Sequence, residues 1–136
     1  MGLRVHPNLR MSNDPKRGVT SANGTAINSE GVQGGEVWGK RAKWVDYSGQ
    51  IDGRTVGIAF FDHPDNLRHP TYWHARTYGL FAANPFGLSS FVGRDADGSH
   101  VIPAGETLHL QYRFVFHEGD AEQAKVEQLY QDFASP

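Results

Sequence analysis

Side chains of the kinds that carry chemistry in enzymes and binding sites gather in the middle of this sequence. Asp62, His63, His69, His74 and Arg76 lie within one segment of the chain. Carboxylate and imidazole groups donate and accept protons, and a guanidinium group binds anionic oxygen atoms. We therefore expect any catalytic or binding site of this chain to lie in the segment from residue 62 to residue 78.

An acid–base pair is one interpretation of this segment. His74 or His63 could exchange a proton with Asp62 or Glu106, and such chemistry would suit the epimerisation of a sugar. It needs a donor and an acceptor on opposite sides of one carbon atom. We predict catalytic roles for His74, His63 and Asp62. Glu106 lies in a Pro-Ala-Gly-Glu turn and is expected to face solvent.

Binding of a carbohydrate-like small molecule is the second interpretation. Imidazole and guanidinium groups bind hydroxyl and carboxylate oxygens, and aromatic rings pack on apolar faces of a ligand. The predicted ligand-binding residues are Arg76, Trp73, His69, Tyr78 and Asn84. The alternative is structural: Trp73 and Tyr78 would belong to the core, Arg76 would pair with Asp62, and Asn84 would end a strand before Pro85.

Metal binding is a third interpretation. His63, His69 and His74 offer three imidazole groups, which Zn²⁺ and Cu²⁺ accept as ligands. Their spacing in a loop does not by itself make them converge. A site would therefore need further ligands from a missing N-terminal half or a partner chain, so we assign no metal ligand to this chain alone, and whether it holds a cofactor stays open.

Composition excludes several classes of protein. Thirteen basic and 15 acidic residues give a net charge of −2, without the basic stripe of a nucleic-acid-binding protein. The absence of cysteine excludes disulfide bonds and thiolate metal sites. Every apolar run is far shorter than the roughly 20 residues of a membrane-spanning helix. The cellular compartment stays open.

Hydrophobic periodicity predicts mainly strands. The expected strands cover residues 3–9, 19–30 (weakly), 43–48, 55–61, 78–84 and 108–117. The run 55–61 is nearly continuous in apolar character, which indicates burial on both faces. The segment 62–77 holds Pro64 and Pro70 and is expected to be an irregular loop.

The clearest alternation runs from Leu108 to His117. One face of this predicted ten-residue strand is apolar and aromatic, and the other carries His109, Gln111 and Arg113. Beyond it, Asp120 and Gln123 form a capping-box pattern, and the periodic apolar residues after them predict a helix that ends near Ala134. We therefore predict an all-β fold, an antiparallel β-sandwich with a C-terminal α-helix, as a single domain over residues 1–136.

Long stretches of the chain resemble the C-terminal part of bacterial proteins of the methane oxygenase PmoA family. The matching stretches are NSEG, VWGKRAKWVDYSG, VGIAFFDHPDNLRHPTYWHARTYGLFAANPFG and PAGETLHLQYRFVFHEGDAE, between residues 28 and 122. The resemblance implies a large sandwich similar to the mutarotase-like and carbohydrate-active supersandwiches. Members of that family are usually longer, so it also implies a chain truncated at its N-terminal side.

Three functions follow as hypotheses. The first is a domain that binds or processes a carbohydrate-like small molecule through the 62–78 loop. The second is a Zn- or Cu-binding protein whose histidines are joined by other ligands. The third is a non-catalytic interaction domain in which a partner chain, or a missing N-terminal half, covers an exposed sheet edge.

Overall fold

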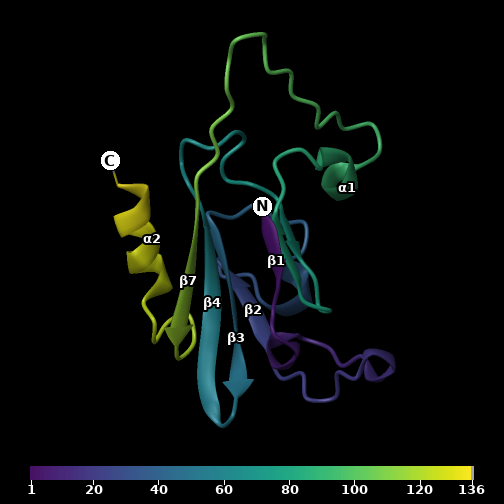
Figure 1. Ribbon diagram of the computed structural model, residues 1–136, viewed down its shortest axis with the longest axis vertical. Coiled ribbons are helices and arrows are strands. Elements are labelled where there is room, and N and C mark those ends of the chain that lie inside the picture. Colours follow the sequence, from purple (N-terminus) through teal and green to yellow (C-terminus); the bar gives the residue numbers. More distant parts are fainter. Residues whose placement is uncertain (136) are drawn as a thin grey trace.

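Two antiparallel sheets packed face to face hold most of the buried apolar side chains. The computed structural model describes residues 1–135 and contains a four-stranded sheet of order β2-β3-β4-β7 and a three-stranded sheet of order β1-β6-β5. The C-terminal helix α2 covers the outer face of the larger sheet (Figure 1). The predicted all-β sandwich with a C-terminal helix is therefore confirmed.

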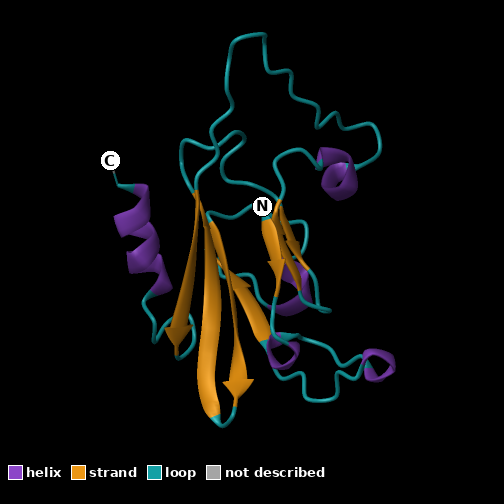
Figure 2. Cartoon of the chain, viewed as in Figure 1, coloured by secondary structure: helices purple, strands orange, loops and turns teal. Residues whose placement is uncertain are grey.

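The larger sheet is built around one long hairpin. β3 (Trp44–Ile51) and β4 (Arg54–Asp62) pair along their whole length and are flanked by β2 (Thr25–Asn28) and β7 (Tyr112–Glu118). The smaller sheet contains β1 (Gly2–Arg4), β5 (Trp73–Ala75) and β6 (Leu80–Ala83). The helices are α1 (Leu88–Val92), α2 (Val126–Ala134) and three short 3₁₀ turns, η1 (Pro7–Leu9), η2 (Pro15–Arg17) and η3 (Gly34–Val37), as Figure 2 shows.

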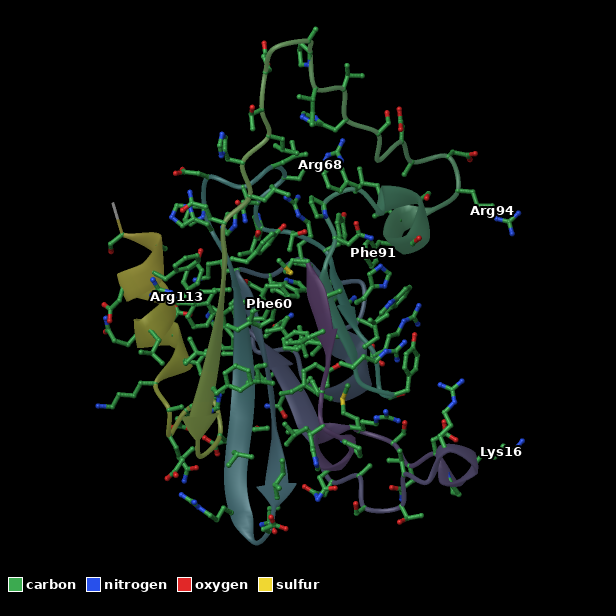
Figure 3. All side chains as sticks on the ribbon, in the orientation of Figure 1. Lys16, Phe60, Arg68, Phe91, Arg94 and Arg113 are labelled. Carbon is green, nitrogen blue, oxygen red and sulfur yellow. The ribbon has the colours of Figure 1, made fainter. Side chains whose placement is uncertain are left out.

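Phe60 is the centre of the core between the two sheets (Figure 3). Its ring lies 5.0 Å from that of Trp73, 5.5 Å from that of Phe81 and 4.0 Å from that of Phe114. The first two contacts are edge-to-face, an arrangement in which aromatic pairs are stabilised beyond their buried area. These rings fix the smaller sheet, and β5 within it, against the larger one.

The residue after Phe60 faces the opposite side. Phe61 is buried under α2, where its ring meets Tyr130 edge-to-face at 5.7 Å, and Val126 completes this second cluster. Successive residues of a strand point to opposite faces, so a strand covered on both sides needs apolar residues at every position. The prediction that β4 is buried on both faces is confirmed from Gly57 onward, whereas Thr55 is exposed and Val56 is half-buried.

Several predicted element boundaries are wrong. The strand expected over 3–9 ends at Arg4 and gives way to η1, and the strand expected over 108–117 covers only 112–118. Residues 93–111 extend beyond the sheets (Figure 1, green), so the alternating residues before Tyr112 have no ladder partner beyond the single bond of Gln111 to His63. Alternation of apolar and polar residues shows that a segment could form a strand, but a strand pairs only where a neighbouring strand supplies hydrogen-bond partners.

The C-terminal helix begins several residues after the predicted capping box. Asp120 and Gln123 form the predicted capping box, with the Gln123 amide donating to the Asp120 side chain at 2.9 Å. The turn that they start is interrupted at Lys125, which adopts a left-handed φ of 54°, and α2 starts at Val126. It ends at Ala134 as predicted. No helix within residues 1–135 has the length and apolar character needed to cross a membrane.

Candidate functional site

The segment predicted to carry chemistry divides into two groups of contacts. The loop expected over 62–77 is interrupted by β5, which pairs with β6. Residues before β5 fold back on Asp62, and we call Asp62, Asn66, His69 and Thr71 the Asp62 network. From β5 onward, alternate side chains face the outside of the smaller sheet. We call Trp38, Tyr72, His74, Arg76, Asn84 and Phe91 the His74 cluster.

The Asp62 network is a closed set of hydrogen bonds. The buried carboxylate of Asp62 accepts from Asn66 Nδ2 at 2.8 Å, from the Thr71 backbone amide at 3.0 Å and from His69 Nδ1 at 2.8 Å. The side chain of Asn66 also bonds both backbone groups of Gln111, at 2.6 Å each. Both oxygens of Asp62 are thus engaged in holding the loop to β4 and to the start of β7.

His63 points away from this network. Its ring lies 5.1 Å from that of Phe133 on α2, and its Nδ1 accepts from the Asp65 backbone amide at 3.2 Å. His63, His69 and His74 therefore contact three different neighbourhoods. Among residues 1–135 no group of three or more His, Asp or Glu side chains is placed to hold a metal ion.

Alternation along β5 places His74 on the outer face. Trp73 and Ala75 are fully buried against the core, and His74 between them is half-buried. The His74 ring lies 4.6 Å from Phe91 of α1, and Phe91 in turn stacks on Tyr72 at 5.1 Å with an interplanar angle of 10°. The short helix α1 thus supplies an aromatic wall beside His74.

Hydrogen bonding sets the tautomer of His74. Asn84 Oδ1 accepts from the Phe86 backbone amide at 3.1 Å, which leaves Asn84 Nδ2 to donate to His74 Nε2 at 3.3 Å. The ring proton is then on Nδ1. Burial lowers the pKa of His74 below its ordinary value, and the positive charge of Arg76 lowers it further. At neutral pH His74 is an uncharged hydrogen-bond donor.

Arg76 is half-buried and lies on the face of Trp38. Its guanidinium carbon is 4.2 Å from the centre of the indole ring, a cation–π contact. Within residues 1–135 Arg76 makes no ion pair, and neither Arg76 Nε nor Trp38 Nε1, both buried, has a hydrogen-bond partner. The expected pairing of Arg76 with Asp62 does not form, because Asp62 is held by its own network.

The other predicted ligand-binding residues separate. Trp73 lies in the core, where its indole N–H donates to the Ala42 carbonyl at 2.9 Å. Tyr78 is exposed outside the core, with Arg4 5.5 Å from its ring centre. His69 belongs to the Asp62 network. The structure thus brings together His74, Arg76 and Asn84 from the predicted set. Their roles as catalytic or binding residues stay predictions.

Trp38 and Phe91 were missed by sequence reasoning. Trp38 follows η3 and Phe91 lies in α1, so both are distant in sequence from β5. The only sequence signal was their type, since a tryptophan in a glycine-rich loop needs something to pack against. Their contact with each other, at 6.0 Å between ring centres, closes the side of the cluster.

A second buried acid–base pair lies outside the predicted segment, on the face of the larger sheet that also carries α2. His117 Nε2 is 2.7 Å from Asp46 Oδ1, and both side chains are buried. The His117 ring crosses Gly57 of β4 to reach Asp46, and a Cβ at Gly57 would overlap that ring. Burial by itself lowers the pKa of His117, but the hydrogen bond and the charge of Asp46 outweigh it, so the pKa lies above its ordinary value.

Comparison with known proteins identifies a family but no activity. A model of a family of unknown function, DUF6807, matches residues 1–131, which is nearly the whole chain. No curated protein and no solved structure matches. The match corrects the resemblance to the methane oxygenase PmoA family, which nothing in the comparisons indicates. It also leaves the predictions of carbohydrate binding and metal binding without support.

Proposed function

Because the chain belongs to DUF6807, a family of unknown function, we infer its function from the site, and we propose that it binds a small anionic molecule on the His74 cluster. The ligand carries a carboxylate or a group of similar charge. The observation that carries this proposal is the uncompensated charge of Arg76, which is half-buried and without an ion-pair partner among the described residues.

Charge compensation is the physical argument. A cation that is partly withdrawn from water loses hydration, and proteins normally restore that loss with a carboxylate or another anion. Asp62, the carboxylate predicted to pair with Arg76, is occupied by its own network. The neighbouring donor His74 N–H adds a hydrogen bond in the same region without adding a second positive charge. A bound anion would satisfy both groups.

The surroundings of Arg76 favour an organic anion over a bare inorganic ion. Trp38, Tyr72 and Phe91 present aromatic surface beside the charged group. Binding sites for small molecules combine such apolar surface with a few polar groups that fix the orientation of the ligand. The polar part of the ligand would meet Arg76 and His74, and its carbon skeleton would contact the rings.

Titration of the whole chain with three compounds tests the proposal. Succinate is a carboxylate without hydroxyl groups, galacturonate is a sugar carboxylate, and galactose is the neutral sugar. We expect both acids to shift the backbone amide resonances of β5 and α1, and galactose to leave them unchanged. Replacing Arg76 by Met should weaken binding of the acids by about tenfold or more, because about 1.4 kcal/mol of charge-assisted hydrogen bonding is lost.

A matched variant controls for net charge. Arg94 is exposed beyond α1 (Figure 3), so Arg94→Met removes the same charge from outside the cluster and should leave binding unchanged. The proposal fails if neither acid binds at about 20 mM, well above a millimolar dissociation constant. It also fails if galactose binds as tightly as galacturonate, or if Arg94→Met weakens binding as much as Arg76→Met.

A further inference from the structure

One side of the sandwich is open, and β7 is the edge strand there. β7 pairs with β4 along one edge. In an antiparallel ladder, hydrogen-bonded pairs alternate with pairs that are not hydrogen-bonded. The Gly119 amide donates to the Thr55 carbonyl and the His63 amide to the Gln111 carbonyl, so the odd-numbered residues of β7 direct their backbone groups to β4.

The even-numbered residues of β7 therefore direct their backbone groups outward. The amide and carbonyl groups of Phe114 and Phe116 have no ladder partner among residues 1–135. β7 is seven residues long and contains neither proline nor lysine, the residues that commonly protect edge strands. An edge of this kind is a template for another strand.

The same residues border an apolar groove. A cavity of about 720 Å³ opens between the smaller sheet and the lower parts of β4 and β7. Its apolar lining residues include Leu3, Val5, Leu9, Val56, Ile58 and Phe116. The side chain of Phe116 is 79% exposed at the rim of this groove. A large aromatic side chain at the border of an apolar groove marks an interaction surface more often than an isolated exposed residue does.

The smaller sheet ends on the same side. β1 is its edge strand, and the bonds from the Val5 amide to Gly79 and from the Ala83 amide to Met1 direct the odd-numbered residues of β1 to β6. The backbone groups of Arg4 therefore face outward, as those of Phe116 do. Both β1 and β7 border the groove, so each layer of the sandwich presents an edge there.

We propose that this open side binds a second copy of the chain, through antiparallel pairing of β7 with β7 of the copy. A twofold axis makes such a contact self-complementary, and a second copy offers edges of both layers, whereas a single peptide strand would cover only one. In this ladder Phe114 and Phe116 of the two copies lie side by side over their grooves. The small net charge of −2 opposes the association only weakly.

Sedimentation equilibrium of the whole chain tests the proposal. We expect the chain to be dimeric at about 200 µM, a concentration at which a contact with a micromolar dissociation constant is nearly saturated. Phe116→Lys should weaken dimerisation by about thirtyfold, the cost of losing one aromatic anchor and placing two like charges across the twofold axis. Val101→Lys is the matched control, because Val101 is 80% exposed in the 93–111 segment, and it should remain a dimer.

Hydrogen exchange gives a second measurement that needs no variant. The amides of Phe114 and Phe116 should exchange more slowly as the concentration of protein rises, and the amide of Val101 should not respond. A wild-type chain that is monomeric at about 200 µM would refute the proposal. So would a Phe116→Lys chain that dimerises like the wild type, or edge amides whose exchange is independent of concentration.

Discussion

The Asp62 network and the His74 cluster are neighbours in sequence, yet they differ in how a charged group is compensated. Asp62 is fully buried and accepts three hydrogen bonds from within the chain. Arg76 is half-buried, lies on the face of Trp38 and has no ion-pair partner among residues 1–135. A buried charge that the fold itself satisfies holds structure together, whereas a charge left without a partner is available to a ligand.

A composition of Asp, His and Arg in one segment suggested one site, and the structure divides it into a structural half and a half with an unsatisfied cation. His and Asn side chains occur in both halves, so the difference lies in whether the charged group finds a partner within the fold. Substitutions in the two halves should therefore affect different properties, stability in the first and ligand binding in the second.

The largest effect is expected from Asp62→Ala. It leaves three donors, two of them buried, without an acceptor and should lower the free energy of unfolding by about 4 kcal/mol. Urea unfolding followed by tryptophan fluorescence measures this change. The control is Asp65→Ala, whose exposed carboxylate should contribute no more than about 0.5 kcal/mol. If the Asp62 variant were as stable as the Asp65 variant, the network would not be structural.

His117→Gln extends the comparison to the other buried pair. Removal of the imidazolium leaves the buried charge of Asp46 without an opposite charge and should cost about 3 kcal/mol at pH 6. Because the pKa of His117 is raised in the folded state, its contribution to stability is complete below about 6.5 and is lost as the pH rises through the folded-state pKa.

Unfolding measured from pH 5.5 to pH 9 separates this pair from other titrating groups. The wild type should lose stability over the upper part of that range, and His117→Gln should lose the corresponding slope. His100→Gln, at an exposed position of the 93–111 segment, should keep the slope of the wild type. Equal slopes in the wild type and His117→Gln would show that the pair contributes nothing.

Arg76→Met should barely change stability. No ion pair among the described residues is broken and the apolar stem is kept, so the loss is limited to the cation–π contact with Trp38, and the free energy of unfolding should fall by no more than about 1 kcal/mol. Arg68→Met is the contrasting variant, because Arg68 donates to the carbonyls of Pro85, Gly98 and Ser99 and its loss should cost about 2 kcal/mol. If Arg76→Met lowered the free energy of unfolding as much as Arg68→Met does, Arg76 would have a structural role.

The smallest expected effect is the pH dependence of ligand binding. Protonation of His74 adds a positive charge beside Arg76, so galacturonate, whose carboxylate stays ionised at pH 5, should bind about threefold more tightly once the pH falls below the lowered pKa of His74, which lies under 6.5. Titrations at pH 7.5 and at pH 5 measure the change. His74→Gln should remove it, and a wild-type affinity that decreases at low pH would contradict the role of His74 as a donor to an anion.

Much of the fold could be predicted from local pattern. The continuous apolar run of β4 indicated a strand buried on both faces, and the spacing of Val126, Leu129 and Tyr130 indicated the amphipathic C-terminal helix. The failures were at boundaries, as in the 108–117 strand. A strand exists only where a neighbour supplies hydrogen-bond partners, and alternation of side chains carries no information about that neighbour.

For the candidate site, only the types of the residues could be predicted from the sequence, and their contacts could not. The sequence alone determined the residue types in the 62–78 segment, the all-β class and the absence of cysteine. Only the tertiary structure decided that Asp62 is engaged by Asn66, His69 and Thr71, that α1 brings Phe91 against His74, and that Arg76 meets Trp38 instead of a carboxylate. The physical reason is that burial and hydrogen-bond partners come from contacts between distant segments, and these contacts fix which polar groups the fold satisfies and which it leaves to a ligand.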